Sequence, residues 1–146
     1  MSANNGRSVR ARHAARDMLV QALYQWQIAG ATEAELTEQF AAAPEYGRID
    51  RAYFLALLHA AISNAADLEA VIAARAHRDV AQLDPIGRAV LLIALSELDL
   101  RPDVPTKVII NEAVELAKRY GPAEAYRFVN AVLDKVAAAT PGRQIG

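Results

Sequence analysis

Basic side chains gather at the beginning of this sequence, where they could neutralise phosphate groups. The first sixteen residues contain no aspartate or glutamate, and their basic members are Arg7, Arg10, Arg12, His13 and Arg16. Because the net charge of the chain is −1, this is a local basic segment on a near-neutral protein, which favours contact with a nucleic acid. A solvated terminus that binds nothing is the alternative, and the residues alone leave both open.

An aromatic side chain is expected on the same surface as two of these arginines. Apolar residues recur at helical spacing and predict a helix over residues 9–29, which Gly30 ends. The arc opposite the apolar one carries Arg10, Arg16 and Tyr24. An unpaired base can stack on a tyrosine ring while guanidinium groups engage phosphates, so this face suits single-stranded RNA. Trp26 lies on the apolar arc and is expected in the core.

A second polar surface is expected on a helical hairpin near the end of the chain. Two amphipathic helices are predicted within residues 104–138, and Gly121 and Pro122 separate them. Glycine just past the end of one helix and proline at the first position of the next are typical of such a break. The outer face of the hairpin is polar, and that face by itself identifies no function.

Motifs of catalysis and metal binding are absent from the sequence. It contains no cysteine and no P-loop, GxGxxG, HExxH or GxSxG pattern, and its three histidines lie far apart. Glu112 and Glu115 are expected to form helix-stabilising charge pairs with Lys118 and Arg119. The sequence therefore predicts a protein that is not an enzyme and uses no metal or cofactor.

The remaining segments predict further helices, which complete an all-α fold. A capping box at residues 32–35 begins a short helix, and residues 50–64 and 64–77 form the third and fourth. Asp84 and Pro85 are typical of a helix start. The helix that follows them is apolar on nearly all sides, as expected of a central buried helix.

About seven helices are therefore expected, divided between two bundles. We expect a flexible basic arm over residues 1–8 and a three-helix bundle over residues 9–64. A second helical bundle is expected over residues 65–138, followed by a frayed tail over residues 139–146.

Composition bounds the class of protein. The chain has 146 residues, of which 53% are hydrophobic and 23% are charged, which is ordinary for a single globular domain. No apolar run reaches the roughly 18 residues of a membrane span, and the N-terminus lacks the apolar centre of a signal peptide. Together with the absence of cysteine, this predicts a cytoplasmic protein with no membrane partner.

Two strings within the predicted hairpin resemble a known family. Residues 110–118 are INEAVELAK and residues 128–135 are FVNAVLDK, and both are similar to the signature of the NusB family of transcription antitermination factors. Residues 21–26, QALYQW, and residues 83–98, LDPIGRAVLLIALSEL, also resemble the family's pattern. The resemblance covers about residues 10–138.

The chain departs from that pattern at several positions, and four of these departures bear on packing or binding. Ala131 stands where the family usually has glycine, Gly87 replaces an acidic residue, and His13 and Ala14 replace two of three consecutive arginines. Alanine at a close helix contact threatens that contact more than the fold. Gly87 puts in doubt a polar partner contact from the start of its helix. Loss of the arginines is expected to weaken RNA binding, or to make it depend on pH through His13.

The resemblance implies a function in transcription. The fold would be NusB-like, with two helical bundles packed side by side, and the RNA would be the boxA element of ribosomal RNA leaders. The protein partner would be the small-subunit ribosomal protein that acts as NusE. Together they would join the antitermination complex on RNA polymerase and oppose termination.

The same resemblance, with the polar faces described above, indicates which residues would contact RNA. They are Arg10, Arg12, Arg16, Tyr24, Lys118, Arg119, Tyr120, Glu124, Tyr126, Arg127 and Asn130. Arginines would neutralise phosphates, tyrosines would stack on bases, and amide and carboxylate groups would contact base edges. We therefore expect the first helix and the corner at Gly121 and Pro122 to lie near each other and to form one cationic, tyrosine-lined strip. Core packing remains an alternative for the tyrosines at 120 and 126, and a solvated face for Arg127 and Asn130.

Two other functions stay open at this point. NusB-like helical domains also occur in some RNA cytosine methyltransferases, an interpretation that requires a downstream catalytic domain with a cysteine. A protein-interaction module that uses its apolar helix surfaces, as a homodimer, is the third hypothesis.

Overall fold

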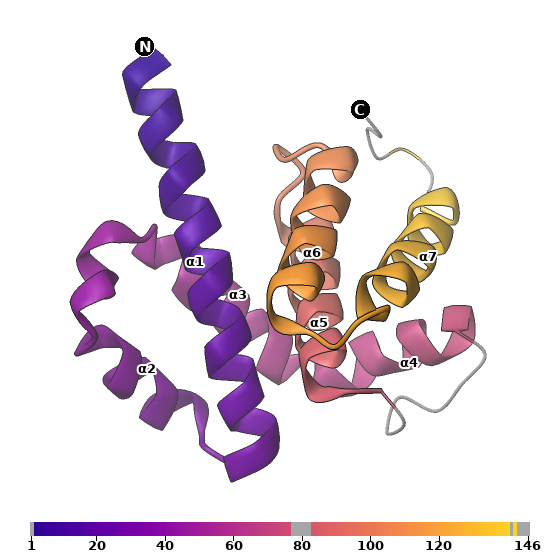
Figure 1. The fold of residues 1–146 in the computed structure, drawn as a ribbon, viewed down its shortest axis with the longest axis horizontal. Coiled ribbons are helices and arrows are strands. Elements are labelled where there is room, and N and C mark those ends of the chain that lie inside the picture. The colour runs from indigo at the N-terminus through magenta and orange to yellow at the C-terminus, as the bar shows by residue number, and fades with distance from the viewer. Residues whose placement is uncertain (1, 77–82, 141, 143–146) are drawn as a thin grey trace.

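The computed structural model describes residues 2–76, 83–140 and 142. Within them lie seven α-helices and one short 3₁₀ helix (Figure 1): α1 (Ser2–Ala29), α2 (Glu33–Ala41), η1 (Pro44–Arg48), α3 (Arg51–Ser63), α4 (Ala65–Ala76), α5 (Pro85–Leu100), α6 (Thr106–Tyr120) and α7 (Ala125–Ala138). The predicted all-α fold is confirmed. Most of the predicted tail over residues 139–146, and the predicted helix end at His77, lie outside the described residues.

Helix α5 forms the centre of the molecule. Asp84 caps its N-terminus by accepting a hydrogen bond from the Gly87 N–H at 2.7 Å, and Pro85 occupies its first turn, as predicted. Residues 89–97 of α5 are all buried, which confirms the expected central helix. One face packs against α1 and α3 and the other against α6 and α7, so the two halves of the molecule share one hydrophobic core.

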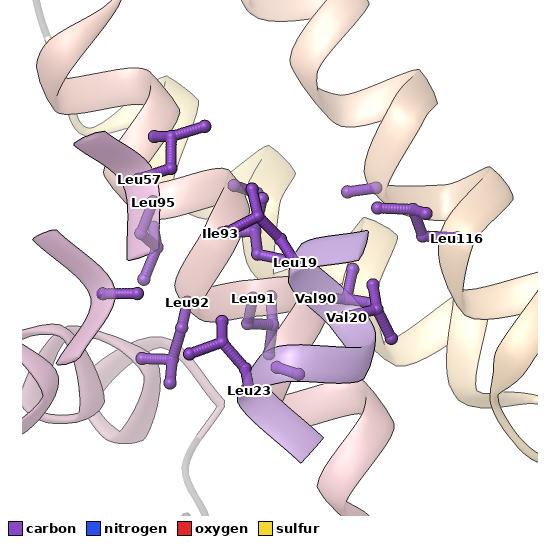
Figure 2. Close-up of a cluster of buried hydrophobic side chains, with 14 of the residues drawn as sticks. Leu19, Val20, Leu23, Leu57, Val90, Leu91, Leu92, Ile93, Leu95 and Leu116 are labelled. Carbon is purple, nitrogen blue, oxygen red and sulfur yellow. The ribbon is translucent and has the colours of Figure 1, made fainter. Parts of the chain in front are cut away.

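Helix α1 supplies much of the packing around α5. Leu19 and Leu23 are fully buried and point toward α5 (Figure 2), where they join Leu57 of α3 and Leu116 of α6 in the same cluster. Trp26 is half-buried against this core. The face of α1 that was predicted to be entirely exposed is partly covered, because α6 packs along it.

The beginning of α1 differs from the prediction. A flexible arm was expected over residues 1–8, but the helix already begins at Ser2. In Figure 1 its first turns extend beyond the other helices, and Arg7, Val9 and Arg10 are exposed on them. Once the packed part of a helix has formed, each further residue adds one hydrogen bond without a new nucleation cost, so a helix can extend past its packing partners.

Local signals in the sequence fix several other helix ends. Gly30 ends α1 in the left-handed conformation, with φ of 68°, a region that favours glycine. The predicted capping box is present at the start of α2, where Thr32 and Glu35 bond reciprocally to each other's backbone N–H. Asp50 caps α3 by accepting a hydrogen bond from the Tyr53 N–H at 3.1 Å.

The corner between α6 and α7 is longer than predicted. Proline was expected at the first position of the second helix, but α7 begins at Ala125, and Pro122 lies in the connecting turn. Glu124 precedes α7 in the left-handed conformation, with φ of 82°. Gly121 has an extended backbone, with φ of −91°, and it is needed for space: a Cβ there would lie 2.8 Å from the Ala117 carbonyl oxygen.

Replacing Gly121 with alanine is expected to destabilise the protein by about 1–3 kcal/mol, the usual cost of overpacking. The new methyl group would press on a backbone oxygen that cannot rotate away. The free energy of unfolding in urea measures the effect. Gly47→Ala is the matched control, because its Cβ would meet nothing closer than 3.9 Å. Equal stability of the two variants would contradict the steric argument.

Two further observations concern the surfaces of these helices. Ala131, which replaces the family's usual glycine, is exposed on α7, so the expected threat to a close helix contact does not arise there. Among the described residues, no single helix has both the length and the hydropathy of a membrane span. Only α3 and α4 taken together reach such values, and they bend by 74° at their junction.

Candidate nucleic-acid interface

The two regions predicted to bind RNA lie side by side. Asp17 of α1 forms an ion pair with Arg119 at the end of α6, and the same carboxylate accepts a hydrogen bond from the Tyr120 hydroxyl at 3.2 Å. One turn earlier, His13 Nδ1 lies 2.9 Å from a carboxylate oxygen of Glu112. These contacts hold the polar side of α1 against α6 and its corner.

A cleft of about 550 Å³ opens beside these contacts, and two tyrosines line it. We call it the tyrosine cleft; its residues are Val20, Gln21, Tyr24, Gln25, Ile86 and Tyr120. Residues Tyr24 and Tyr120 are 40% and 38% exposed, so both present area on which a base can stack. The amide groups of the two glutamines offer donors and acceptors to base edges.

Burial and the neighbouring carboxylate both act on Tyr120. Partial burial raises the pKa of its hydroxyl above the ordinary value, and the negative charge of Asp17 raises that pKa further. Tyr120 therefore stays a neutral hydrogen-bond donor at physiological pH. Core packing was an alternative for this ring, and its exposure at the cleft favours a binding role instead.

A second cleft lies at the corner between α6 and α7, next to the start of α5. We call it the corner cleft; it has a volume of about 480 Å³ and is lined by Leu83, Asp84, Pro122, Glu124, Ala125, Arg127 and Phe128. The beginning of α5 joins the two clefts, because Ile86 lines the first, and Asp84 lines the second. Phe128 begins the FVNAVLDK string, and the sequence carried no signal that its ring would reach a cleft.

Three cations near the hairpin corner, Lys118, Arg119 and Arg127, are paired with carboxylates. Lys118 lies 3.8 Å from Glu115, and Arg127 lies 3.1 Å from Glu124. Their charges flank the half-buried Tyr126 ring, at 5.0 Å and 5.8 Å from its centre. The predicted pairing of Lys118 with Glu115 is present, whereas Glu112 faces α1 instead. The surface around the corner is therefore of mixed charge, not the cationic strip that the sequence indicated.

Arg16 requires a correction. It was predicted to lie on the exposed face of the first helix and to contact RNA, but it is only 4% exposed. Its guanidinium donates two hydrogen bonds of 2.9 Å to the carboxylate of Glu97, which is itself buried. A third bond of 3.1 Å reaches Glu112. Arg16 therefore joins α1 to α5 and α6, and phosphate groups cannot reach it in this structure.

The charge of Arg16 is stabilised in spite of its burial. Burial by itself disfavours the guanidinium cation, but the hydrogen bonds and charge of Glu97 outweigh it, so the pKa of Arg16 lies above its ordinary value. Tyr53 completes the cluster by donating a hydrogen bond of 2.5 Å to Glu97. Burial, followed by the charge of Glu97, raises the pKa of the Tyr53 hydroxyl.

Arg12 also turns away from the tyrosine cleft. Its guanidinium lies over the Tyr53 ring at 4.8 Å and 3.7 Å from carboxylate oxygens of Asp50 and Asp103. The side chain is 30% exposed. Of the predicted contacts on α1, only Tyr24 lines a cleft beside the corner, while Arg10 is exposed on the projecting part of the helix. On α7, Asn130 is exposed one turn beyond Tyr126.

Some residues that line the tyrosine cleft were not predicted as site residues, among them Gln21, Gln25 and Ile86. The two glutamines flank Tyr24 within the QALYQW string, and that string was the available signal. Among the described residues, no group of three or more histidine, aspartate or glutamate side chains is placed to hold a metal ion.

Comparison with known families and proteins agrees with the resemblance seen in the sequence. Residues 13–138 match the model of the NusB family. The transcription antitermination protein NusB of Yersinia enterocolitica is 49% identical over 127 residues, which make up 87% of this chain and 92% of that protein. The corresponding protein of Yersinia pestis is 48% identical over the same length.

Solved structures show the same fold. NusB of T. maritima superimposes with a TM-score of 0.75 at 26% identity, covering 87% of this chain and 90% of that one. A chain from a crystal structure of the antitermination factors NusB and NusE in complex with dsRNA also gives a TM-score of 0.75. It covers 90% of this chain and 98% of its own length at 24% identity, a likeness that concerns the fold.

Proposed function

The chain belongs to the NusB family, and from that premise we propose that it is an RNA-binding transcription antitermination factor, not an enzyme, and that it recognises boxA RNA. Curated relatives of nearly the same length carry the name of antitermination protein. The RNA would be the boxA element in the leaders of ribosomal RNA transcripts, bound as an unpaired strand.

The tyrosine cleft is the observation that carries this proposal. Tyr24 comes from α1 and Tyr120 from α6, and the Asp17 contacts hold these helices together at the cleft. Two partly exposed rings in one cleft suit two unstacked bases, and the neighbouring glutamines suit their edges. The strand would continue past the start of α5 to the corner cleft, where Phe128 offers a further ring. Tyr126 does not line this cleft, but it adjoins the lining residues Ala125 and Arg127 in sequence.

The partner proposed for this protein is the small-subunit ribosomal protein that acts as NusE. Support comes from the fold neighbour that was crystallised as NusB with NusE and dsRNA. Together the two proteins and the RNA would join the antitermination complex on RNA polymerase. Lys118, Arg119 and Arg127 at the corner are all paired with carboxylates, which fits binding in which a second protein supplies further phosphate contacts.

A gel-shift titration tests the proposed function. Purified protein is titrated against boxA-type RNA and against a scrambled RNA of equal composition, with and without the purified ribosomal protein. We expect a preference for boxA-type RNA that increases when the ribosomal protein is present. Equal affinity for both RNAs under both conditions would contradict the proposal.

Light scattering of the free protein tests the homodimer hypothesis, which requires twice the mass of one chain.

Asp17→Asn is expected to strengthen RNA binding by about two- to fivefold at low salt, the scale of one exposed charge pair. The substitution removes a negative charge beside the tyrosine cleft and frees Arg119 to engage a phosphate. Fluorescence anisotropy over a salt series measures the effect, and the log–log slope should become steeper by up to about 0.7. Weaker binding would show instead that Asp17 is needed to hold Arg119 and Tyr120 in place.

A further inference from the structure

A third cleft lies on the other side of α1, between that helix, the end of α2 and η1. We call it the α1–η1 groove; it has a volume of about 370 Å³ and is lined by Ala14, Asp17, Met18, Gln21, Phe40, Ala43, Glu45, Arg48 and Ile49. Met18, Phe40 and Ile49 are buried and form an apolar floor. Gln21, Glu45 and Arg48 are exposed and supply polar groups at its edge.

The groove is continuous with the tyrosine cleft across one helix. Gln21 lines both cavities. Asp17, one turn before it, lines the groove and also binds Arg119 and Tyr120. A strand that lies in the tyrosine cleft therefore needs to cross only the width of α1 at Gln21 to reach the groove.

The charges of this region differ from those of the corner. Residues 7, 10, 14, 17 and 21 follow one stripe of α1, so Arg7 and Arg10 lie on the stripe that lines the groove. In the part of the chain that the structure describes, no ion pair involves Arg7, Arg10 or Arg48, whereas Lys118, Arg119 and Arg127 all have carboxylate partners.

Two carboxylates also border the groove, and they are compatible with the same ligand. Asp17 is engaged by Arg119, so its charge is largely compensated. Glu45 is exposed at the edge, where a carboxylate can accept a hydrogen bond from the exocyclic amino group of a base. The groove thus combines an apolar floor, groups for a base edge and cations for phosphates, which are the requirements of an unpaired nucleotide.

We propose that the α1–η1 groove binds a further nucleotide of the RNA strand that occupies the tyrosine cleft, with Arg48 and Arg10 at its phosphates. This inference rests on the proposed function, because it extends the same RNA path. The base lies on Met18 and Phe40, and the Gln21 amide contacts the strand at the crossing point. The cations that the corner lacks for phosphate binding are then supplied from this side of α1.

The test compares RNAs of two lengths. A short boxA-type RNA and the same RNA extended by a few nucleotides, at the 5′ end or at the 3′ end, are titrated by fluorescence anisotropy. We expect one extension to bind about tenfold more tightly, within the range for one stacked base. Arg48→Ala should abolish that gain with little effect on the short RNA, and Arg10→Ala should reduce the gain. The salt slope of the extended RNA should fall by about 0.7 for each arginine removed.

Arg51→Ala is the matched control. Arg51 is an exposed arginine close in sequence that lies over the Tyr46 ring and donates to the Tyr46 carbonyl oxygen, without lining the groove. This variant should keep the full gain from the extension. The groove proposal is wrong if the short RNA binds but neither extension adds affinity. It is also wrong if Arg51→Ala and Arg48→Ala lose the same share of the affinity gained from the extension. A protein partner would then be the remaining occupant of the groove. If neither RNA binds, the proposed function itself fails.

Discussion

Replacing Arg16 with alanine lowers the free energy of unfolding by about 3–5 kcal/mol, the usual cost of breaking a buried ion pair. The substitution leaves the buried carboxylate of Glu97 without the two guanidinium hydrogen bonds that compensate its charge. A carboxylate in that position must then either remain charged in the interior or take up a proton. Urea denaturation, followed by circular dichroism, measures the loss.

Two control variants separate this effect from a general loss of charge. Lys118→Ala removes an exposed cation whose partner Glu115 is also exposed, and it should change the stability by less than about 1 kcal/mol. The double variant Arg16→Met/Glu97→Leu removes both charges together, so it should recover most of the stability. A double variant that is as unstable as Arg16→Ala would show that the charges themselves are not responsible.

Removing the two rings of the tyrosine cleft has the largest expected effect on RNA binding. Each base that loses its stacking partner costs about 1–3 kcal/mol, so Tyr24→Ala and Tyr120→Ala should each weaken binding by roughly five- to a hundredfold. The rings are partly exposed, and the fold should tolerate both changes. Anisotropy with boxA-type RNA gives the affinities, and thermal unfolding confirms that the variants remain folded.

Phenylalanine substitutions distinguish stacking from hydrogen bonding at the same positions. Tyr120→Phe keeps the ring but loses the hydrogen bond to Asp17, and Tyr24→Phe keeps the ring of α1. Both variants should bind RNA within about threefold of the parent if stacking dominates, because the aromatic face is unchanged. A loss as large as that of the alanine variants would mean that the hydroxyl groups carry the interaction.

Short-range signals predicted the helix ends that depend on neighbouring residues. The capping box of Thr32 and Glu35, the Asp84–Pro85 start of α5 and the glycine end of α1 were all confirmed. The corner after α6 was only partly predicted. Its proline does not begin α7, because two more residues, Ala123 and left-handed Glu124, complete the turn, and no local rule requires that conformation of a glutamate.

Side-chain partners that lie far apart in sequence could not be predicted. A helical wheel divides α1 into one apolar and one polar arc, but α1 packs against α3 and α5 on one side and α6 on another. Val20 and Arg16 of the polar arc are therefore buried. The partner of Arg16, Glu97, is 81 residues away, and no pattern in the sequence indicated that the two would meet.

The adjacency of α1 and the corner was the expectation on which the RNA surface depended. It was predicted from the resemblance and the polar faces, and the contacts of Asp17 with Arg119 and Tyr120 agree with it. The charge of that surface was predicted less well. Pairing with Glu115 and Glu124 compensates two of its cations, because neighbouring carboxylates on the same helix surface reach them first.

Photo-crosslinking tests most directly whether RNA occupies the cleft between α1 and α6. A boxA-type RNA that carries 4-thiouracil is irradiated in complex with the protein, and the crosslinked peptides are identified by mass spectrometry. We expect crosslinks at Tyr24 and Tyr120, with further ones at Tyr126 or Phe128 beside the corner cleft. Crosslinks confined to α4 and the C-terminal half of α7, with none in α1 or α6, would contradict the proposed RNA surface.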